Sequence, residues 1–321
     1  MTLSKIALAM CCVGLMAGAA QAQETGTLKK IKDTGVISLG NRESSIPFSF
    51  YDNNHNVVGY ANDVAMAVVA EVKKELKLPN LKVTQTPITS QNRIPLVQNG
   101  TIDMECGSTT NNAERQKQAA FSNTFFIIGT RLLAKNSSGI KDFADLKGKN
   151  VVTTAGTTSE RLLREMNQKD NMGMNIISAK DHGEAAITLH SGRAVAFMMD
   201  DALLAGERAK FKDAKDYSIV GKPQSYEAYG CMMRKDDPAF KKLVDKAVAD
   251  YQKSGQAQKD FAKWFQQPIA ALGGVNMDFP PSAEMAALWK SRQVSLAGFT
   301  SRRAPSVRNA EAEGANPSAS F

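Results

Sequence analysis

The sequence predicts an α/β protein built from two lobes with a cleft between them. The chain has 321 residues, enough for two domains of ordinary size, and 43% of them are hydrophobic. In both halves, short apolar runs alternate with longer segments in which apolar residues recur every three or four positions. This alternation is typical of parallel-rich sheets with helices on both faces. Because ligands of such sheets bind beyond the carboxyl ends of the strands, a functional site is expected there.

The first half of the chain is predicted to alternate strands with helices. The strands are expected at 36–39, 81–88 and 102–106, and the helices at 61–76 and 90–98. Helix 61–76 has a clear signal, because Val64, Val68 and Val72 recur four residues apart. The strand at 102–106 runs into Gly107-Ser108-Thr109-Thr110, a hydroxyl-rich turn, and a polar helix is expected after it.

The second half repeats this order. Strands are expected at 130–134, 151–154, 174–178 and 194–199, and helices from 158 to about 167, at 182–190 and at 238–251. Asp237 and Pro238 mark the start of the last helix, as its cap and its first residue. Beyond residue 282 the periodicity is lost, so residues 283–321 are predicted to form a disordered tail.

The N-terminus has the features of a cleaved signal peptide, residues 1–22. Lys5 supplies a basic start, residues 6–19 are apolar, and Ala20-Gln21-Ala22 is a small-x-small cleavage pattern. No later segment approaches the roughly 18 apolar residues of a membrane span. The mature chain is therefore predicted to be exported and soluble.

Removal of that segment leaves Cys106 and Cys231 as the remaining cysteines. In an oxidising compartment, two cysteines are most simply interpreted as one disulfide, since a zinc site needs more ligands at close spacing. The chain has 40 basic and 32 acidic side chains, and the basic ones are spread along helix faces rather than gathered with aromatic residues. A nucleic-acid partner is not expected, whereas a positive field that attracts small anions is.

Two predicted strands run into hydroxyl-rich turns that open helices, at 106–110 and 154–158. Hydroxyls, free backbone N–H groups and the helix dipole together can bind an anion. Helix capping is the alternative, because Thr157 and Glu160 have the spacing of a capping box. A single turn of this kind favours capping, but two that face each other across a cleft favour a carboxylate site.

Charged side chains stand near the same strand ends. Arg42, Arg93 and Arg115 each follow a predicted strand, and guanidinium groups in fixed positions bind carboxylates. Asp200 and Asp201 follow another strand, where an acid either accepts an ammonium group or caps the next helix. Arginines, hydroxyls and one acid describe a site for a zwitterion with surplus negative charge, such as an acidic amino acid.

Signatures of catalysis are weak. The patterns Gly-x-Ser-x-Gly and Gly-x-x-x-x-Gly-Lys-Ser/Thr do not occur in the sequence. His55, His182 and His190 lack the spacing of metal ligands, and His182, considered alone, is more typical of a structural or exposed position. The chain is therefore predicted not to be an enzyme and to need no cofactor or metal.

Several longer segments point to a known family. They lie at 40–44, 89–95, 105–112, 114–117, 179–183, 197–206 and 228–232. With these segments the chain resembles, over roughly residues 27–280, the periplasmic solute-binding proteins of ABC-type amino-acid uptake systems, known as bacterial solute-binding protein family 3. The resemblance is strongest to members that bind acidic amino acids.

The resemblance implies the type II periplasmic-binding-protein fold, with a mixed sheet flanked by helices in each lobe and two strands as the hinge. Lobe 1 would comprise residues 27–127 and 228–280, and lobe 2 residues 128–227. Both Cys106 and Cys231 would then lie in lobe 1.

The resemblance also implies a role for each site residue. Residues matching Arg115 and Thr110 bind the α-carboxylate of the ligand, helped by hydroxyls of the turn that contains Thr154, Thr157 and Thr158. The acid matching Asp200 accepts the α-ammonium group. The residues expected at the side-chain carboxylate are Arg42, Ser90, Arg93, Ser108 and His182.

The function implied is capture of L-glutamate and L-aspartate in the periplasm, by a monomer that delivers them to an inner-membrane ABC permease. Two rivals stay open at this stage. One is an enzyme on the same fold, such as a dehydratase of a cyclic carboxylate. The other is a sensor protein that presents its bound ligand to a chemoreceptor or kinase.

Overall fold

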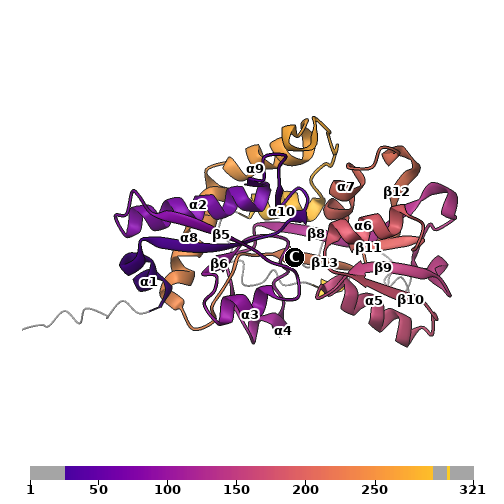
Figure 1. Cartoon of the computed structure of the whole chain (residues 1–321), viewed down its shortest axis with the longest axis horizontal. Helices are drawn as coiled ribbons and strands as arrows, with labels where there is room; N and C mark the ends of the chain where they lie inside the picture. The colour runs from indigo at the N-terminus through magenta and orange to yellow at the C-terminus, as the bar shows by residue number, and fades with distance from the viewer. Residues whose placement is uncertain (1–25, 292–301, 304–321) are drawn as a thin grey trace, which may run out of the picture.

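The computed structural model of the chain describes residues 26–291 and 302–303. The predicted signal peptide, residues 1–22, lies outside them. The described residues form two lobes side by side, each around its own sheet, so the predicted two-lobed α/β architecture is confirmed (Figure 1). Within the described part of the chain, no helix is long and apolar enough to cross a membrane.

The first lobe is built on a five-stranded sheet in the order β5-β1-β6-β14-β7. Its strands are β1 (Val36–Asn41), β5 (Lys82–Pro87), β6 (Met104–Glu105), β7 (Ala120–Phe121) and β14 (Met232–Met233). The helices around it are α1 (Thr27–Thr34), α2 (Tyr60–Glu75), α3 (Arg93–Gln98), α4 (Ala113–Gln116), α8 (Pro238–Lys253) and α9 (Gln256–Phe261). A small antiparallel sheet of β2 (Ser44–Ser45), β3 (Ser49–Tyr51) and β4 (Val57–Val58) also contacts α2.

The second lobe is built on a sheet in the order β10-β9-β11-β8-β13-β15, with β12 also paired to β8. Its strands are β8 (Phe126–Lys135), β9 (Asn150–Thr154), β10 (Asn175–Ala179), β11 (Ala196–Asp200), β12 (Tyr217–Val220), β13 (Ser225–Tyr229) and β15 (Arg302–Arg303). Its helices are α5 (Thr158–Lys169), α6 (His182–His190) and α7 (Asp201–Arg208). Because β9 is parallel to both β10 and β11, their carboxyl ends lie at one edge of the sheet.

Two antiparallel strands connect the lobes. In β8 and β13, Phe126 pairs with Tyr229 and Gly129 with Tyr226, next to the points where the chain passes to and from β7 and β14 of the first sheet. The strand predicted at 130–134 is longer in the structure, because residues 126–128 are apolar and buried and continue the pairing.

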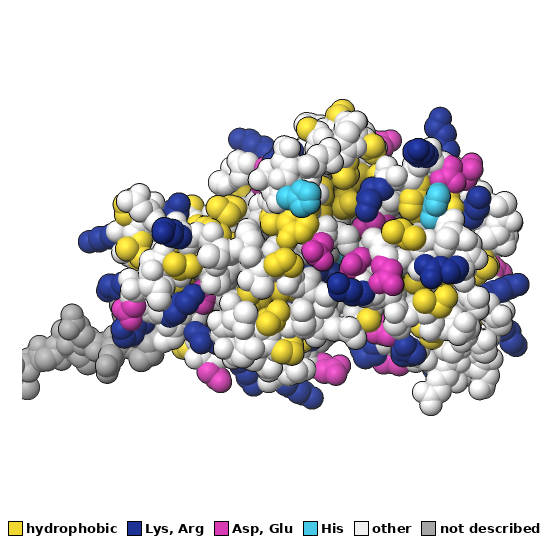
Figure 2. Space-filling view, viewed as in Figure 1, with side chains coloured by type: hydrophobic (Ala, Val, Ile, Leu, Met, Phe, Trp, Pro, Cys, Tyr) yellow, Lys and Arg dark blue, Asp and Glu magenta, His cyan; other side chains and the backbone are white. Residues whose placement is uncertain are grey.

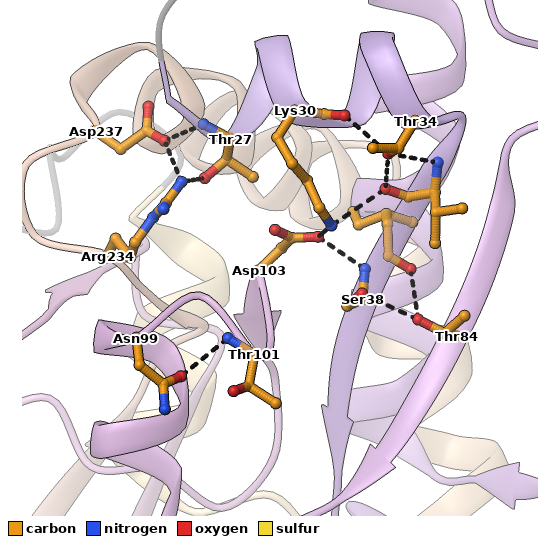
Figure 3. A network of polar contacts seen from close by, with 12 residues as sticks. Thr27, Lys30, Thr34, Ser38, Thr84, Asn99, Thr101, Asp103, Arg234 and Asp237 are labelled. Atoms are coloured by element: carbon orange, nitrogen blue, oxygen red, sulfur yellow. Dashed lines mark hydrogen bonds and ion pairs between the residues drawn. The ribbon is translucent and has the colours of Figure 1, made fainter.

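The N-terminal helix α1, which the sequence did not predict, is held by polar contacts at both of its ends (Figure 3). Lys30 Nζ donates to Asp103 Oδ2 at 2.7 Å, and the Ser38 backbone N–H donates to the same oxygen at 2.8 Å. The Thr27 backbone N–H donates to Asp237 Oδ2 at 2.6 Å, and Asp237 also caps α8. Since these partners are distant in sequence, local periodicity gave no sign of them.

The predicted disordered tail, 283–321, is wrong at its start. Residues Ala283–Lys290 form the helix α10, which contacts β8 and in which Met285 and Leu288 are buried in the main hydrophobic core. The Ser282 hydroxyl caps this helix by accepting from the Met285 backbone N–H. A helix of two turns has too few apolar positions to show a period, which is why the sequence did not reveal it. Residues 292–301 and 304–321 lie outside the described residues.

The predicted disulfide between Cys106 and Cys231 is confirmed, with an S–S distance of 2.04 Å. It joins the residue after β6 to the residue before β14, and both cysteines are buried. The bond therefore fixes the turn that begins at Gly107 against the segment that follows the connecting strand β13.

Candidate ligand-binding site

The two lobes contact each other near the ends of their strands, and this region of contact is the seam between the lobes. Ser44 Oγ, from the first lobe, donates to Asp181 Oδ1 at 3.3 Å and accepts from the Gly183 backbone N–H at 3.2 Å. Arg115 Nη2 donates to the Gly156 carbonyl at 3.2 Å across the same seam. One predicted site residue, Arg115, thus lies at the contact between the lobes, where ligands are expected beyond the carboxyl ends of parallel strands.

Arg42 links the two lobes near the end of β1. Its side chain is buried, Nη1 donates to Ser108 Oγ at 3.2 Å, and Nη2 lies 3.5 Å from His182 Nε2. Burial and the nearby charge of Arg93 lower the pKa of Arg42 to about 10. The guanidinium group stays charged at neutral pH and makes no ion pair within the described part of the chain, which suits it to an anionic ligand.

Arg93 and Arg115 complete a cluster of buried arginines. Arg93, at the start of α3, donates from Nη1 to Thr109 Oγ1 at 2.6 Å, while its Nε has no partner among the described residues. Arg115, in α4, donates from Nη1 to the Thr110 carbonyl at 3.0 Å. Burial and the charge of Arg93 lower the pKa of Arg115 to about 9.

His182 is a neutral member of this cluster. It is 1% exposed, and burial together with the charges of Arg42 and Arg93 lowers its pKa well below the usual value. One ring nitrogen, Nε2, lies 3.5 Å from Arg42 Nη2, and the other, Nδ1, lies 2.8 Å from Thr154 Oγ1. The ring therefore fixes Thr154 and Arg42 relative to each other.

Asp200 is a buried acid at the end of β11, and its charge is opposite to that of the arginines. Its Oδ1 accepts from Thr130 Oγ1 at 2.8 Å, and its Oδ2 accepts from the Tyr229 hydroxyl. Burial, and then the nearby charge of Glu227, raise the pKa of Asp200 to about 7. Asp200 does not cap α7 with its side chain, so the capping alternative for this residue is wrong.

The two hydroxyl-rich turns differ in what their hydroxyls do. Thr157 caps α5, since its Oγ1 accepts from the Glu160 backbone N–H at 3.0 Å and donates to the Thr154 carbonyl at 2.7 Å. Its hydroxyl proton is thus already used, whereas Thr158 is buried beside it at the helix start. In the other turn Ser108 accepts from Arg42, and Thr110 is buried and forms a bridge with Tyr229.

Several buried polar atoms near these groups have no hydrogen-bond partner among the described residues. They are Ser90 Oγ, Arg93 Nε and both polar atoms of the Asn41 carboxamide. Asn41 is the last residue of β1 and pairs with Pro87, the last residue of the neighbouring parallel strand β5, and Ser90 follows β5. Buried polar atoms are rarely left unpaired without a reason, and a polar ligand between the lobes would supply their partners. Beside Arg115, a hollow of about 490 Å³ opens between α4 and α5.

The distribution of surface charge agrees with the sequence, whereas the partners of Asp200 were not predicted. On the face of the described residues in Figure 2, Lys and Arg side chains are scattered among acids over both lobes rather than gathered in one basic patch. Tyr229, Thr130 and Ser159 surround Asp200, although none of them was predicted as a site residue. Tyr229 lies within the recognisable segment 228–232, which was the only sequence signal for it.

We expect ligand affinity to rise with pH up to about 7 and then to level off. If a ligand ammonium group donates to Asp200, as the resemblance implies, it favours the ionised form, so binding lowers the pKa of Asp200 from about 7 and releases a proton below that pH. The dissociation constant should rise about tenfold for each unit by which the pH falls below 6. Titration calorimetry between pH 5 and 8, in buffers of different ionisation enthalpy, measures both effects. Equal affinity at pH 5 and pH 8 would contradict this assignment.

The fold and the site together are those of a two-lobed binding protein with a cluster of buried charged side chains between its lobes. A family model described as bacterial extracellular solute-binding proteins, family 3, matches residues 37–267, and the chain belongs to this family. The type II periplasmic-binding-protein fold predicted from the sequence is thereby confirmed.

Close relatives agree with this assignment. The chain is 61% identical to a glutamate/aspartate import solute-binding protein of Salmonella typhimurium, over 91% of this chain and 98% of that protein. It is 63% identical to an L-glutamate/L-aspartate-binding protein of Pseudomonas aeruginosa, over 81% of this chain and 86% of that one. Among solved structures, an ancestral arginine-binding protein bound to glutamine matches with a TM-score of 0.65 and 31% identity, over 72% of this chain and 98% of that one.

Proposed function

We propose that this chain captures L-glutamate and L-aspartate in the periplasm and delivers them to an inner-membrane ABC permease. The main support is the cluster of three buried arginines together with the buried acid Asp200, beside polar atoms that have no partner among the described residues. Two carboxylates and one ammonium group match this set of charges. The names of the relatives at 61% and 63% identity favour the same ligands, and they favour a binding protein over an enzyme.

Each end of the ligand is assigned to its own group of side chains. The α-carboxylate is bound by Arg115 with Thr110 and Thr158, and by the start of α5, where Thr154 and Thr157 shape the turn. The α-ammonium group donates to Asp200. The side-chain carboxylate is bound by Arg42, Ser90, Arg93, Ser108 and His182.

Closure of the lobes is how the permease distinguishes the ligand-bound protein from the ligand-free protein. We place lobe 1 at residues 27–127 and 228–280 and lobe 2 at 128–227, with β8 and β13 as the hinge. Because Arg42 and Arg115 both contact the opposite lobe, a ligand that pairs with them binds the closed form more tightly than the open form. The ligand then shifts the population toward the closed form, whose surface the permease recognises.

Titration calorimetry on refolded, ligand-free mature protein tests the proposal, with glutamate, aspartate, glutamine and histidine as ligands. One-to-one binding of glutamate and aspartate, each much tighter than the other two, is expected. Glutamine lacks one carboxylate and leaves a buried guanidinium group unpaired, which costs several kcal/mol. Tight binding of glutamine or histidine instead would overturn the assigned pocket, and no binding at all would reopen the enzyme alternative.

A further inference from the structure

Glu105 is a buried acid beside the three arginines, and the proposed site gives it no role. It ends β6 in the centre of the first sheet, paired with Gly40 of β1 on one side and with Met232 of β14 on the other. Its side chain is fully buried. One carboxylate oxygen, Oε2, has no hydrogen-bond partner among the described residues. A fully buried carboxylate needs an opposite charge nearby to be tolerated.

A single hydroxyl connects Glu105 to the arginine cluster. The Thr109 hydroxyl donates to Glu105 Oε1 at 2.6 Å, and the same hydroxyl accepts from Arg93 Nη1 at 2.6 Å. The carboxylate lies close to the start of the turn, because a β-carbon on Gly107 would be 2.7 Å from Glu105 Oε1. A side chain at position 107 would push the carboxylate away, so glycine at this position allows the approach. The contact joins strand, turn and helix α3 into one polar unit.

The arginines repel each other, and Glu105 reduces that repulsion. The charge of Arg93 lowers the pKa of both Arg42 and Arg115, after the larger effect of burial. The charge of Glu105 acts in the opposite direction on Arg42, Arg93 and Arg115. Without a ligand, Glu105 is thus a source of negative charge that all three guanidinium groups share.

We propose that Glu105 is a built-in counter-charge that sets affinity and specificity. It takes the electrostatic place of a ligand carboxylate while the site is empty, which keeps the arginine cluster assembled. It also weakens the attraction for an anionic ligand, so that the ligand can leave again. This inference rests on the proposed function, because it requires a ligand with net negative charge.

The isosteric substitution Glu105→Gln should have two opposite effects. Loss of the counter-charge leaves the guanidinium groups repelling each other, so the ligand-free protein should melt at a lower temperature. The more positive site should bind glutamate about tenfold more tightly, by the usual size of such interactions at intermediate dielectric. Glutamine has no net charge and gains less, so the ratio of the two affinities should rise. A role confined to holding the fold would lower stability and affinity together.

Dissociation constants for glutamate and glutamine, and melting temperatures with and without ligand, should be compared for the unchanged chain and Glu105→Gln. Asp103→Asn is the matched control, because Asp103 precedes Glu105 by two residues and pairs with Lys30 instead of the cluster (Figure 3). It should lower stability and leave glutamate affinity unchanged. Thr109→Val keeps the charge of Glu105 but removes the connecting hydroxyl, so it should not tighten glutamate binding.

The outcomes separate this inference from the proposed function. If the unchanged chain binds neither glutamate nor aspartate, the proposed function fails first. If it binds glutamate but Glu105→Gln binds it equally or more weakly, or if Asp103→Asn tightens binding as much, the counter-charge role is wrong. Should Glu105→Gln melt without cooperativity when empty, recovery of the transition with glutamate supports the proposal. Failure to recover it assigns Glu105 to the fold and overturns the proposal.

Discussion

Arg115→Ala is expected to abolish binding of glutamate and aspartate. Arg115 is assigned to the α-carboxylate, which every amino-acid ligand has, and it also reaches across the seam to the Gly156 carbonyl. Removing one partner of a buried charge pair costs about 3–5 kcal/mol, or more than a hundredfold in the dissociation constant. Titration calorimetry with both ligands measures the loss, and thermal melting of the ligand-free variant shows whether it folds.

Arg93→Ala is the matched comparison for this result. Arg93 is assigned to the side-chain carboxylate, so its loss should weaken glutamate far more than glutamine, whereas Arg115→Ala should weaken both. Both side chains are buried arginines of the first lobe, so a general effect of removing a buried positive charge would be similar in the two variants. Unchanged glutamate affinity in both variants would mean that the arginines have been assigned to the wrong site.

The sequence predicted elements well where periodicity and capping are local. Helix α6 was predicted at 182–190, its bounds in the structure, and α8 was predicted to within two residues because Asp237 and Pro238 define its start. Helices α1 and α10 were missed, since each is short and is fixed mainly by contacts with distant residues. Local signals cannot report such contacts.

The candidate site, too, was predicted where the signals are local and missed where distant residues make contact. Strand ends supplied Arg42, Arg93, Arg115 and Asp200, because the carboxyl end of a strand can be read from the sequence. The pairing of Asp200 with Tyr229 and Thr130 joins residues 29 and 70 positions apart, which no local pattern indicates. For Thr157 the sequence left capping and ligand binding open, and in the structure its hydroxyl caps α5.

Among the described glycines at the contact between the lobes, Gly206 has the least room for an added β-carbon. It lies in α7 of the second lobe, packed against β2 of the first. A β-carbon at Gly206 would come closer to the backbone carbonyl of Ile46 than real β-carbons come to any atom. Because that neighbour is backbone in a buried segment, it cannot move aside as the end of a flexible side chain could.

Gly206→Ala is therefore expected to weaken all ligands alike by disfavouring closure. Overpacking of this kind costs about 1–3 kcal/mol, which corresponds to roughly ten- to more than hundredfold weaker binding. Alanine also favours a helix more than glycine does, so the open, ligand-free protein should be as stable as before or more so. Calorimetry with glutamate and glutamine should show the same loss for each, unlike the selective loss in Arg93→Ala.

Gly183→Ala provides the control for the Gly206 experiment. Gly183 also lies at the seam, but its added carbon would meet the Ser44 side chain at 3.3 Å, a contact that small shifts can relieve. It should therefore weaken binding much less than Gly206→Ala. X-ray scattering with saturating glutamate should show incomplete compaction for Gly206→Ala only. If Gly206→Ala bound glutamate as tightly as the unchanged chain, the contact between α7 and β2 would not be part of closure.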